Sequence, residues 1–249
     1  MSSEFESRIA VVTGAGSGIG LKVAELLHEA GSKVFGLDLS EGQMGSVATF
    51  VKCDISSDES VQQAFAQIKA STDVIDLLIN NAGIGAAGSV EQATTEEWLK
   101  VLNVNVIGTS RVSAAALPFL RKSNAASITN TCSIAATAGL PNRAIYSASK
   151  GAVLSLTLAM AADFIKEKIR VNCVNPGTAD TPWVARLLEK ATDPVAEKAA
   201  LEARQPSGRL VSAEEVARSI LFLASPNQSA ITGTALAVDG GMQGLRLPK

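Results

Sequence analysis

The sequence predicts a single α/β domain built on a doubly wound parallel sheet of about seven strands. Short runs rich in β-branched residues alternate along the chain with segments of helical periodicity. Strands that read as nearly continuous apolar runs, with helices between them, are typical of a parallel sheet covered on both faces. A chain of 249 residues with 47% apolar and 18% charged side chains is long enough to bury one large core.

The expected elements follow one another in a regular order. The strands are the runs RIAVVTG (8–14), SKVFGLD (32–38), TFVKCD (49–54), IDLLINN (75–81), ASITNTCS (126–133), IRVNCVNPG (169–177) and ALAVDGG (235–241). The expected helices cover roughly residues 19–30, 58–70, 94–121, 143–166 and 212–224. A helix-rich insertion with periodic apolar positions suits a lid that excludes water from a reaction. We therefore expect one domain over residues 1–249 with a lid segment at about 183–210.

Composition and charge argue against several classes of function. The chain has 22 basic and 24 acidic side chains and no block of like charge, so we expect neither a nucleic acid nor a membrane as partner. It begins without the features of a signal peptide, and no apolar run reaches the ~18 residues of a membrane span. We therefore expect a soluble cytoplasmic protein. The widely spaced Cys53, Cys132 and Cys173 indicate reduced core thiols, and the single His28 indicates a surface residue, so no metal site is expected.

A glycine-rich turn, TGAGSGIG at residues 13–20, follows the first strand and opens the first helix. Gly14, Gly16 and Gly18 permit a tight turn and a close approach of the backbone to a pyrophosphate. The following helix offers unpaired N–H groups to such an anion. In doubly wound sheets, ligands bind beyond the carboxyl ends of the strands, which is where this turn lies. The alternative is an ordinary glycine-rich loop.

Asp38 ends the second strand, about twenty residues after the glycines. A carboxylate at this place can accept hydrogen bonds from the ribose hydroxyls of an adenosine and would repel a 2′-phosphate. Neither the glycine turn nor the residues directly after Asp38 carry an arginine or a lysine. The cofactor is therefore expected to be NAD rather than NADP. Asp38 could instead cap a helix, although Ser40 is available for that role.

The stretch NRAIYSASK, residues 142–150, places Tyr146 and Lys150 one helical turn apart. On a helix the two side chains share a face, close enough for the ammonium to favour the phenolate. Such a pair can transfer a proton. Taken alone, however, the pair also fits an ordinary amphipathic helix with Tyr in the core and Lys in water.

Four motifs together resemble the short-chain dehydrogenase/reductase family. They are TGAGSGIG, NNAG at residues 80–83, YSASK at 146–150 and NPG at 175–177, and the similarity extends from Arg8 to Gly241. The family implies a single Rossmann-type domain, hydride transfer to or from a nicotinamide, and a dimer or tetramer. With this resemblance, the ordinary interpretation of the Tyr/Lys pair becomes far less favoured.

The resemblance also assigns roles to individual residues. The family's catalytic set falls on Asn105, Ser133, Tyr146 and Lys150, with Asn103 as a rival for the asparagine. Tyr146 would take the alcohol proton, Ser133 would hydrogen-bond the substrate oxygen, and Asn105 would hold a water that links Lys150 to solvent. The residues matched to the cofactor are Gly14, Gly16, Ser17, Gly18, Ile19, Gly20, Asp38, Asp54, Ile55, Asn81, Ala82, Gly83, Tyr146, Lys150, Pro176, Gly177, Ala179 and Thr181. For Asn80 we expect a structural role that ties neighbouring strands together.

The substrate is the least determined part of the prediction. The closest similarity is to the branch with cytosolic 3-hydroxybutyrate dehydrogenase and 2-keto-3-deoxy-L-fuconate dehydrogenase. Members of this branch act on small carboxylates, and it places substrate-binding arginines where this chain has Arg143, Arg186 and Arg204; Ser133 and Tyr146 would contact the substrate as well. Any single arginine could instead form a surface or interface ion pair. Two other functions stay open: a sugar (aldose) 1-dehydrogenase, and an NAD-sensing protein without turnover, against which the intact catalytic set argues.

The segment after Lys150, GAVLSLTLAMAADF at residues 151–164, is apolar around more of its circumference than a half-exposed helix needs. We expect a partner subunit to cover part of it, in a homotetramer or possibly a dimer. The alternative is a helix that is buried within its own subunit.

Overall fold

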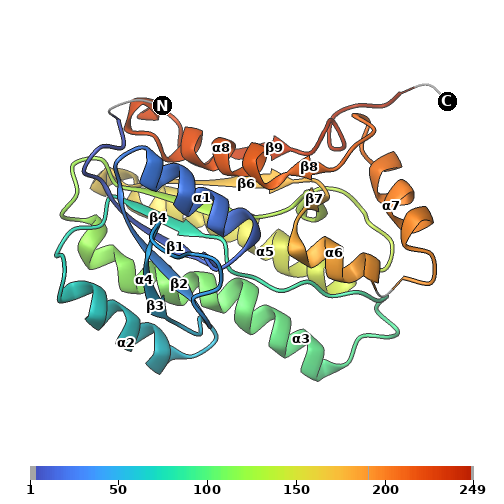
Figure 1. The fold of residues 1–249 in the computed structure, drawn as a ribbon, viewed down its shortest axis with the longest axis horizontal. Coiled ribbons are helices and arrows are strands. Elements are labelled where there is room, and N and C mark those ends of the chain that lie inside the picture. Colours follow the sequence, from blue (N-terminus) through green and yellow to red (C-terminus); the bar gives the residue numbers. More distant parts are fainter. Residues whose placement is uncertain (1–3, 190, 248–249) are drawn as a thin grey trace.

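The computed structural model describes residues 4–189 and 191–247 and has a parallel sheet at its centre (Figure 1). Seven strands lie in the order β3-β2-β1-β4-β5-β6-β9. Their bounds are β1 Ile9–Thr13, β2 Lys33–Asp38, β3 Thr49–Lys52, β4 Leu77–Asn80, β5 Ser127–Thr131, β6 Arg170–Pro176 and β9 Ala235–Val238. Each expected run contains one strand, so the predicted fold is confirmed. The order reverses between β1 and β4, which is the kind of switch point where doubly wound sheets bind ligands.

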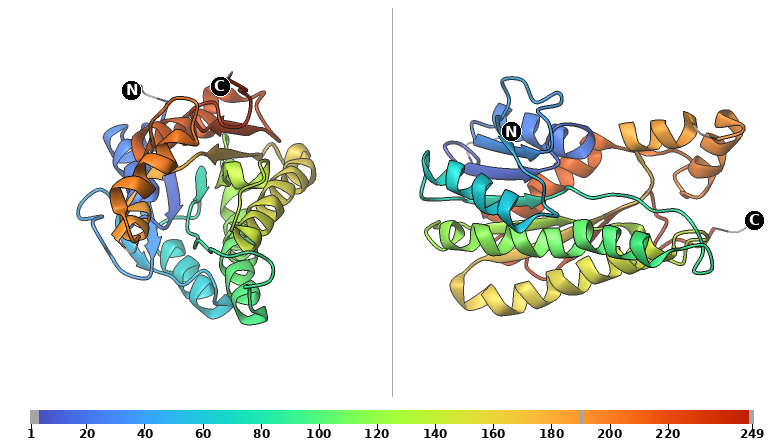
Figure 2. Two further views of the ribbon diagram at one scale, coloured as in Figure 1. Left: turned by 90° about the vertical axis from the view of Figure 1, so that its right-hand side faces the viewer. Right: turned by 90° about the horizontal axis from the view of Figure 1, so that it is seen from below.

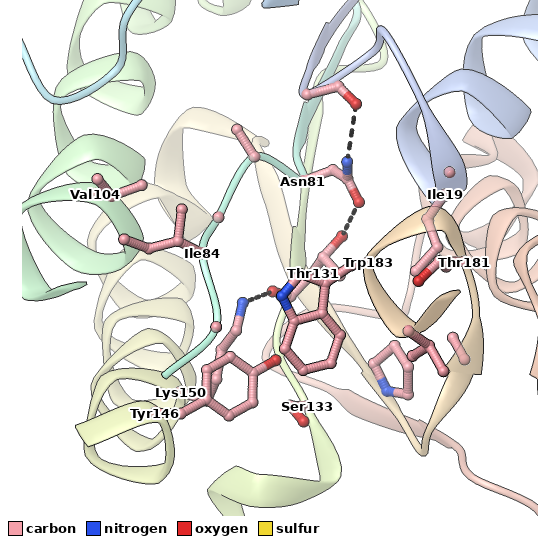
Figure 3. A pocket seen from close by; sticks show the side chains of 18 of the residues that line it. Ile19, Asn81, Ile84, Val104, Thr131, Ser133, Tyr146, Lys150, Thr181 and Trp183 are labelled. Carbon is pink, nitrogen blue, oxygen red and sulfur yellow. Dashed lines mark hydrogen bonds between the residues drawn. The ribbon is translucent and has the colours of Figure 1, made fainter. Parts of the chain in front are cut away.

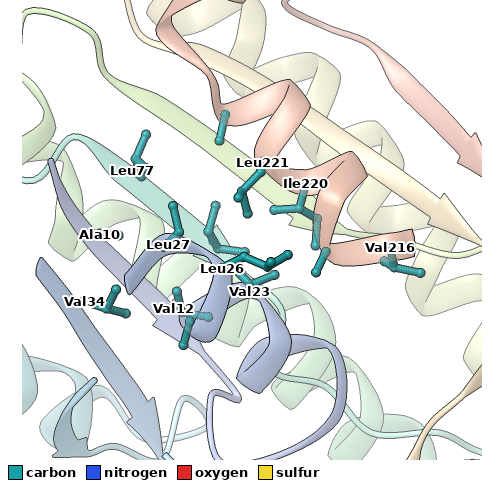
Figure 4. Packing of buried hydrophobic residues seen from close by; sticks show 14 of the residues in the cluster. Ala10, Val12, Val23, Leu26, Leu27, Val34, Leu77, Val216, Ile220 and Leu221 are labelled. Carbon is teal, nitrogen blue, oxygen red and sulfur yellow. The ribbon is translucent and has the colours of Figure 1, made fainter. Parts of the chain in front are cut away.

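Helices cover both faces of this sheet (Figures 1 and 2). Their bounds are α1 Gly18–Glu29, α2 Asp58–Lys69, α3 Thr95–Leu102, α4 Thr109–Leu120, α5 Ala144–Phe164, α6 Pro182–Glu189, α7 Pro194–Ala203 and α8 Ala213–Ala224. Side chains alternate between the two faces because the strand period is two residues. Val12 of β1 joins the core under α1 and α8, and its neighbour Val11 joins the core under α2, α4 and α5. Figure 4 shows the first of these cores, where Leu27 of α1 packs with Ile220 and Leu221 of α8.

The long helix expected at residues 94–121 is continuous but contains a π-helical turn near its middle. α3 and α4 are joined by a π-helical turn, Asn103–Gly108, and both flanking residues keep α-helical backbone angles. A widened turn of this kind frequently marks a functional site. It carries Asn105, whose side chain it brings beneath the carboxyl end of β4.

A buried hydrogen-bond chain ties the sheet to the helices below it. Asn80 Nδ2 at the end of β4 donates to Asn130 Oδ1 of β5 at 2.9 Å and to Ser113 Oγ of α4 at 2.9 Å. Asn130 Nδ2 then donates to Thr157 Oγ1 of α5 at 2.9 Å. The structural role expected for Asn80 is therefore confirmed.

The segment expected to form a lid leaves the sheet and returns to almost the same point. Two short strands, β7 Ala179–Asp180 and β8 Val211–Ser212, pair in parallel at its two ends. Between them lie α6 and α7, which are held together by a small apolar cluster of Val184, Leu188, Leu201 and Leu210. In Figure 1 the pair stands apart from the main sheet, beyond the carboxyl ends of the strands.

Three smaller expectations can be compared with the structure. The three cysteines are free and buried, and burial raises the pKa of the Cys53 thiol to about 11. His28 is exposed, as expected. The alternative role of Asp38 as a helix cap is wrong, because residues 39–48 form an irregular loop that leads straight into β3.

Among the described residues, one helix is long and apolar enough to cross a membrane. It is α5 with the turn that follows it, Ala144–Glu167, and 33% of its most apolar window is buried within the subunit. The core helix of a soluble protein passes the same test, and α5 does pack against the sheet through Val153, Thr157 and Met160.

Arg170, the first residue of β6, has a buried guanidinium that binds carbonyl oxygens at the carboxyl end of α8. Nη1 donates to Leu223 O at 2.7 Å, and Nη2 donates to Ala224 O at 3.0 Å and Ser225 O at 2.9 Å. These carbonyls belong to the end of the helix, where no backbone partner is available. A planar group with several fixed donors is needed to satisfy them together.

We expect Arg170→Lys to lower the free energy of unfolding by about 1 to 3 kcal/mol, because one ammonium cannot reach all of these carbonyls. Urea denaturation followed by circular dichroism measures the change. Arg121→Lys is the matched control, since Arg121 is an exposed partner of Glu167, and its unfolding midpoint should stay close to that of the unmodified protein. Equal midpoints for the two variants would contradict the role given to Arg170.

Candidate active site

A cavity of about 710 Å3 lies at the carboxyl ends of the strands and reaches beneath α6 and α7 (Figure 3). Most of the residues predicted for the site line it together. They are Gly14, Ser17, Gly18, Ile19, Asp38, Asp54, Ile55, Asn81, Ala82, Gly83, Ser133, Arg143, Tyr146, Lys150, Pro176, Gly177, Ala179, Thr181, Arg186 and Arg204. Residues far apart in the sequence thus meet at one edge of the sheet.

The glycine-rich turn is shaped as the sequence predicts. Gly14 and Gly18 have φ angles of +67° and +58°, which side chains rarely adopt. A Cβ on Gly14 would lie 3.0 Å from the Cα of Ala82, so the turn also packs tightly against the end of β4. The side chain of Ser17 makes no capping bond to α1, and the first turn of α1 has no acidic residue. The first N–H groups of α1 therefore remain able to bind an anion.

The carboxylate of Asp38 is held in place beside this turn. Oδ2 accepts from Gly16 N at 2.9 Å and Oδ1 accepts from Leu39 N at 2.7 Å. Farther along the same end of the cavity, the hydroxyl and amide of Ser56 hold the pKa of Asp54 below its usual value. This end of the cavity is therefore negatively charged and offers acceptors to hydroxyl and amino groups.

These features fit a dinucleotide. The cavity has a volume within the usual range of ligand sites, a glycine cradle that side chains would fill, and a helix N-terminus next to it. Asp38 lies where a ribose would be recognised. The opposite end of the cavity holds Tyr146, Lys150 and Ser133, so a bound nicotinamide nucleotide would extend from the carboxylates towards them.

Tyr146 and Lys150 both project from the first turns of α5 towards the cavity (Figure 3). Lys150 Nζ lies 5.8 Å from the centroid of the Tyr146 ring and donates to Thr131 O, at the end of β5, at 2.8 Å. Lys150 is only 6% exposed and forms no ion pair with any carboxylate that the structure describes. Its positive charge is therefore left to act on groups inside the cavity.

Ser133 follows β5 and begins a short 3-10 turn, Ile134–Ala136. Its Oγ accepts from Ala135 N at 3.1 Å. Because this contact uses an oxygen lone pair, the hydroxyl proton of Ser133 remains available for an oxygen atom of a ligand. Figure 3 shows Ser133 on the same side of the cavity as Tyr146.

Three predicted residues do not line the cavity. Asn105 is 1% exposed and lies one layer below it: Oδ1 accepts from Ile84 N at 2.8 Å, and Nδ2 donates to Ile84 O at 2.9 Å and to Ser149 Oγ at 3.0 Å. Asn105 thus fixes the loop after β4 to α5. Its rival Asn103 bonds Ser56 O and Arg111 instead.

Gly16 and Gly20 are the other two. Gly16 donates its N–H to Asp38, and its carbonyl accepts from Gln43 N at 2.9 Å, so it shapes the turn from behind. A Cβ on Gly20 would overlap the carbonyl oxygen of Gly14, which means that Gly20 lets α1 pack closely on the turn. Both glycines support the site without facing a ligand.

Asn81 lines the cavity, but its side chain is used to join three strands. Nδ2 donates to Thr13 O at 3.2 Å, and Oδ1 accepts from Thr131 Oγ1 at 3.3 Å (Figure 3). Only the backbone of this residue and the neighbouring Ala82 and Gly83 is left to face a ligand.

The three predicted arginines all reach the cavity, and they lack carboxylate partners. Arg143 donates only to the carbonyl of its neighbour Asn142, at 3.3 Å. The guanidinium groups of Arg186 and Arg204 form neither a hydrogen bond nor an ion pair with any residue that the structure describes. The arginines paired with a carboxylate are Arg8, Arg111, Arg121, Arg209 and Arg218. The guanidinium groups in the cavity are therefore free to bind an anion.

Sequence reasoning missed several residues of the cavity wall. They include Ile84, Gly85, Val104, Thr131, Leu140, Trp183, Leu187 and Leu201. Helical spacing could have indicated two of them, because Trp183 lies three residues before Arg186 and four before Leu187, which are the separations that place side chains on one helix face. The others come from loops and strand ends that carry no periodic signal.

Comparison with known proteins agrees with this geometry. Residues 14–243 match the family model described as enoyl-(acyl carrier protein) reductase. The cis-4-hydroxycyclohexanecarboxylate dehydrogenase of Sinomonas cyclohexanicum is 38% identical over 97% of this chain and 98% of its own.

Two solved structures are also similar. The ligand-free aldohexose dehydrogenase of Thermoplasma acidophilum has a TM-score of 0.92 at 33% identity and covers 99% of both chains. The 3-ketoacyl-(acyl-carrier-protein) reductase of Brucella melitensis, complexed with NADH, has a TM-score of 0.87 at 33% identity over 96% of this chain and 99% of its own. The chain therefore belongs to the short-chain dehydrogenase/reductase family and is an oxidoreductase that acts on CH–OH groups.

Proposed function

We propose that this protein is an NAD-dependent dehydrogenase of a small hydroxy acid or a 2-keto-3-deoxy sugar acid. The observation that carries the proposal is the set of three guanidinium groups, Arg143, Arg186 and Arg204, that line the cavity without a carboxylate partner. Arg186 and Arg204 are exposed and Arg143 is half-buried, so an anion that enters the cavity meets guanidinium groups that no carboxylate of the described residues already occupies. A guanidinium fork binds a carboxylate through two parallel charge-assisted hydrogen bonds, which fix direction as well as distance.

Under this proposal the residues around Tyr146 handle the substrate's hydroxyl group. The bound nicotinamide supplies the acceptor or donor of the hydride. Tyr146 takes the hydroxyl proton, and the ammonium of Lys150, which no carboxylate that the structure describes neutralises, favours its phenolate. Ser133 donates its free proton to the substrate oxygen and keeps that oxygen near the phenol. The arginines hold the acid group away from the reacting carbon.

The preference for NAD rests on Asp38. Its two oxygens are held by Gly16 N and Leu39 N, so the charge cannot move aside for a 2′-phosphate. Position 39, where a basic residue could bind that phosphate, is a leucine. The similar structure of a reductase complexed with NADH supports the use of a nicotinamide nucleotide here.

A second candidate function is a sugar (aldose) 1-dehydrogenase. It is favoured by the close structural match to an aldohexose dehydrogenase. The relative named for a hydroxycyclohexanecarboxylate favours the acid, and we prefer the acid because a neutral sugar leaves three positive charges without a counter-ion. A non-catalytic NAD sensor would not need Tyr146, Lys150 and Ser133 around one cavity.

We further propose a soluble, cytoplasmic homo-oligomer, either a tetramer or a dimer. Along α5, Val153 and Met160 are buried in the subunit, whereas Leu158 is 49% exposed and Ile165, just after the helix, is 51% exposed. An apolar surface of this kind suits a second copy of the chain. Because the same helix carries Tyr146 and Lys150 into the cavity, burial in a membrane would disrupt the site.

Tyr146→Phe tests the chemistry. The change removes the phenol oxygen that takes the substrate proton but leaves most of the packing, so turnover should fall by ~10² to 10⁴ while NAD still binds. Initial rates with a panel of hydroxy acids and aldoses measure turnover, and calorimetry measures NAD binding. Turnover close to that of the unmodified protein would refute the role of Tyr146.

Asp38→Ala tests the choice of nucleotide. Loss of the carboxylate removes the ribose contact and frees two N–H groups for a 2′-phosphate, so the ratio of kcat/KM for NAD to that for NADP should fall about tenfold or more. Asp54→Asn is the control, because it removes a charge at the same end of the cavity but farther from the glycine turn, and it should shift the ratio much less. An unmodified protein that used both nucleotides equally well would contradict the assignment.

Arginine variants test the class of substrate. The test uses three variants, Arg143→Ala, Arg186→Ala and Arg204→Ala. Each should weaken transition-state binding of the acid by ~1.5 to 3 kcal/mol, as measured from the fall in kcat/KM, and should weaken binding of its neutral amide or lactone much less. Arg121→Ala, outside the cavity, should change neither. If all three cavity variants kept the original kcat/KM, or if the best substrate proved to be an uncharged sugar, the aldose dehydrogenase would be the better assignment.

A further inference from the structure

Trp183 crosses the cavity from one wall to the other. It lies in the first turn of α6, and its indole ring rests on Gly85 in the loop after β4. A Cβ on Gly85 would overlap the ring at Cζ2 and lie 2.8 Å from Cε2 and 3.1 Å from Nε1. Both residues line the cavity, and Figure 3 shows the indole pointing into it. The contact exists only because residue 85 has no side chain.

The start of α6 also touches the opposite wall. A Cβ on Gly18, in the glycine-rich turn, would be 3.6 Å from Pro182 and 3.7 Å from Thr181. The segment Thr181–Trp183 therefore spans from the glycine turn to the loop after β4. Asn81, Ala82 and Gly83, the residues matched to the cofactor ribose, line the same cavity.

The indole has unused binding capacity. Trp183 is 43% exposed although it projects into the cavity, and its Nε1–H has no hydrogen-bond partner among the residues that the structure describes. Flat aromatic surfaces of this kind are stabilised by stacking on another flat ring. The nicotinamide ring of a bound nucleotide is such a ring and would enter at this end of the cavity.

We propose that Trp183, seated on Gly85, clamps the nicotinamide half of the bound nucleotide. Arg186 lies one helical turn farther along the same face of α6, so the clamp also sets that guanidinium over the substrate end. The inference rests on the proposed use of NAD, but not on the identity of the substrate. It adds Trp183 to the nucleotide site and gives Gly85 a positioning role.

Fluorescence tests the contact directly, because Trp98 and Trp183 are the only tryptophans of the chain. In Trp98→Phe, saturating NAD should quench most of the emission of Trp183 and reduce its accessibility to acrylamide. ADP-ribose has the adenosine and diphosphate but no nicotinamide, so it should bind with little quenching. In Trp183→Phe, NAD should leave the emission of Trp98 nearly unchanged.

Calorimetry then tests the energetic role. Trp183→Ala should weaken NAD binding about tenfold and leave ADP-ribose binding unchanged. The NAD affinity of Trp183→Phe should lie between those of Trp183→Ala and the unmodified protein. Gly85→Ala should reproduce the effect of Trp183→Ala by displacing the ring. Gly139→Ala is the matched control, because a Cβ on Gly139 meets nothing within 4 Å. If NAD and ADP-ribose lost the same amount of affinity, the substitution would have damaged the site as a whole, and the proposed clamp would be overturned.

The results separate the clamp from the proposed function. If NAD binds and the emission of Trp183 does not change, the clamp is wrong while the dehydrogenase assignment stands. If NAD quenches Trp183 but no hydroxy acid is oxidised, the clamp stands and the substrate class falls. If the unmodified protein does not bind NAD, both are wrong.

Discussion

The whole site depends on a buried hydrogen-bond chain that joins Asn80 of β4, Asn130 of β5 and Thr157 of α5. Amide groups buried this deeply are costly to leave unpaired. These hydrogen bonds therefore favour one register between β4 and β5 and one placement of α5 on the sheet. That placement decides where Lys150 lies, and its ammonium completes the link by donating to Thr131 O. Ser133, just after β5, and Tyr146 on α5 come from separate elements, yet their relative position is fixed by core polar groups that do not line the cavity.

Charge is divided between the two ends of the cavity. Asp38 and Asp54 make the nucleotide end negative, and Lys150 with the three cavity arginines makes the other end positive. Field lines concentrate in a cleft with low-dielectric walls, so a small anion is drawn towards the lysine and arginine end. A dinucleotide entering from the other side is oriented by the same division, because its diphosphate prefers the N-terminus of α1 to the carboxylates. The same distribution of charge therefore favours the dinucleotide at one end of the cavity and the small anion at the other.

The sequence predicts the sheet and the local motifs well because those signals are local. Buried parallel strands read as apolar runs, and a glycine-rich turn between a strand and a helix has few structural roles besides holding a phosphate group. The failures concern contacts between distant segments or changes in hydrogen-bond pattern. Nothing in the composition around Asn105 announces a π-helical turn. That Arg186 lacks a partner, or that Trp183 rests on Gly85, follows only when the chain has folded. For Asp38 the sequence left a helix cap open as the less favoured alternative, and only the irregular loop at residues 39–48 excludes it.

The pairing of β7 with β8 has a consequence for how this fold can change over time. Because adjacent paired strands lie only about 4.8 Å apart, the segment between Asp180 and Val211 begins and ends at nearly the same point of the framework. Its α6 and α7 share an apolar cluster of their own and take little from the main core. Insertions, deletions or wholesale replacement there leave the strand register intact and cost little in loop closure. The segment that carries Arg186 and Arg204 can thus be altered without moving Ser133, Tyr146 and Lys150, which are held by the main sheet and α5.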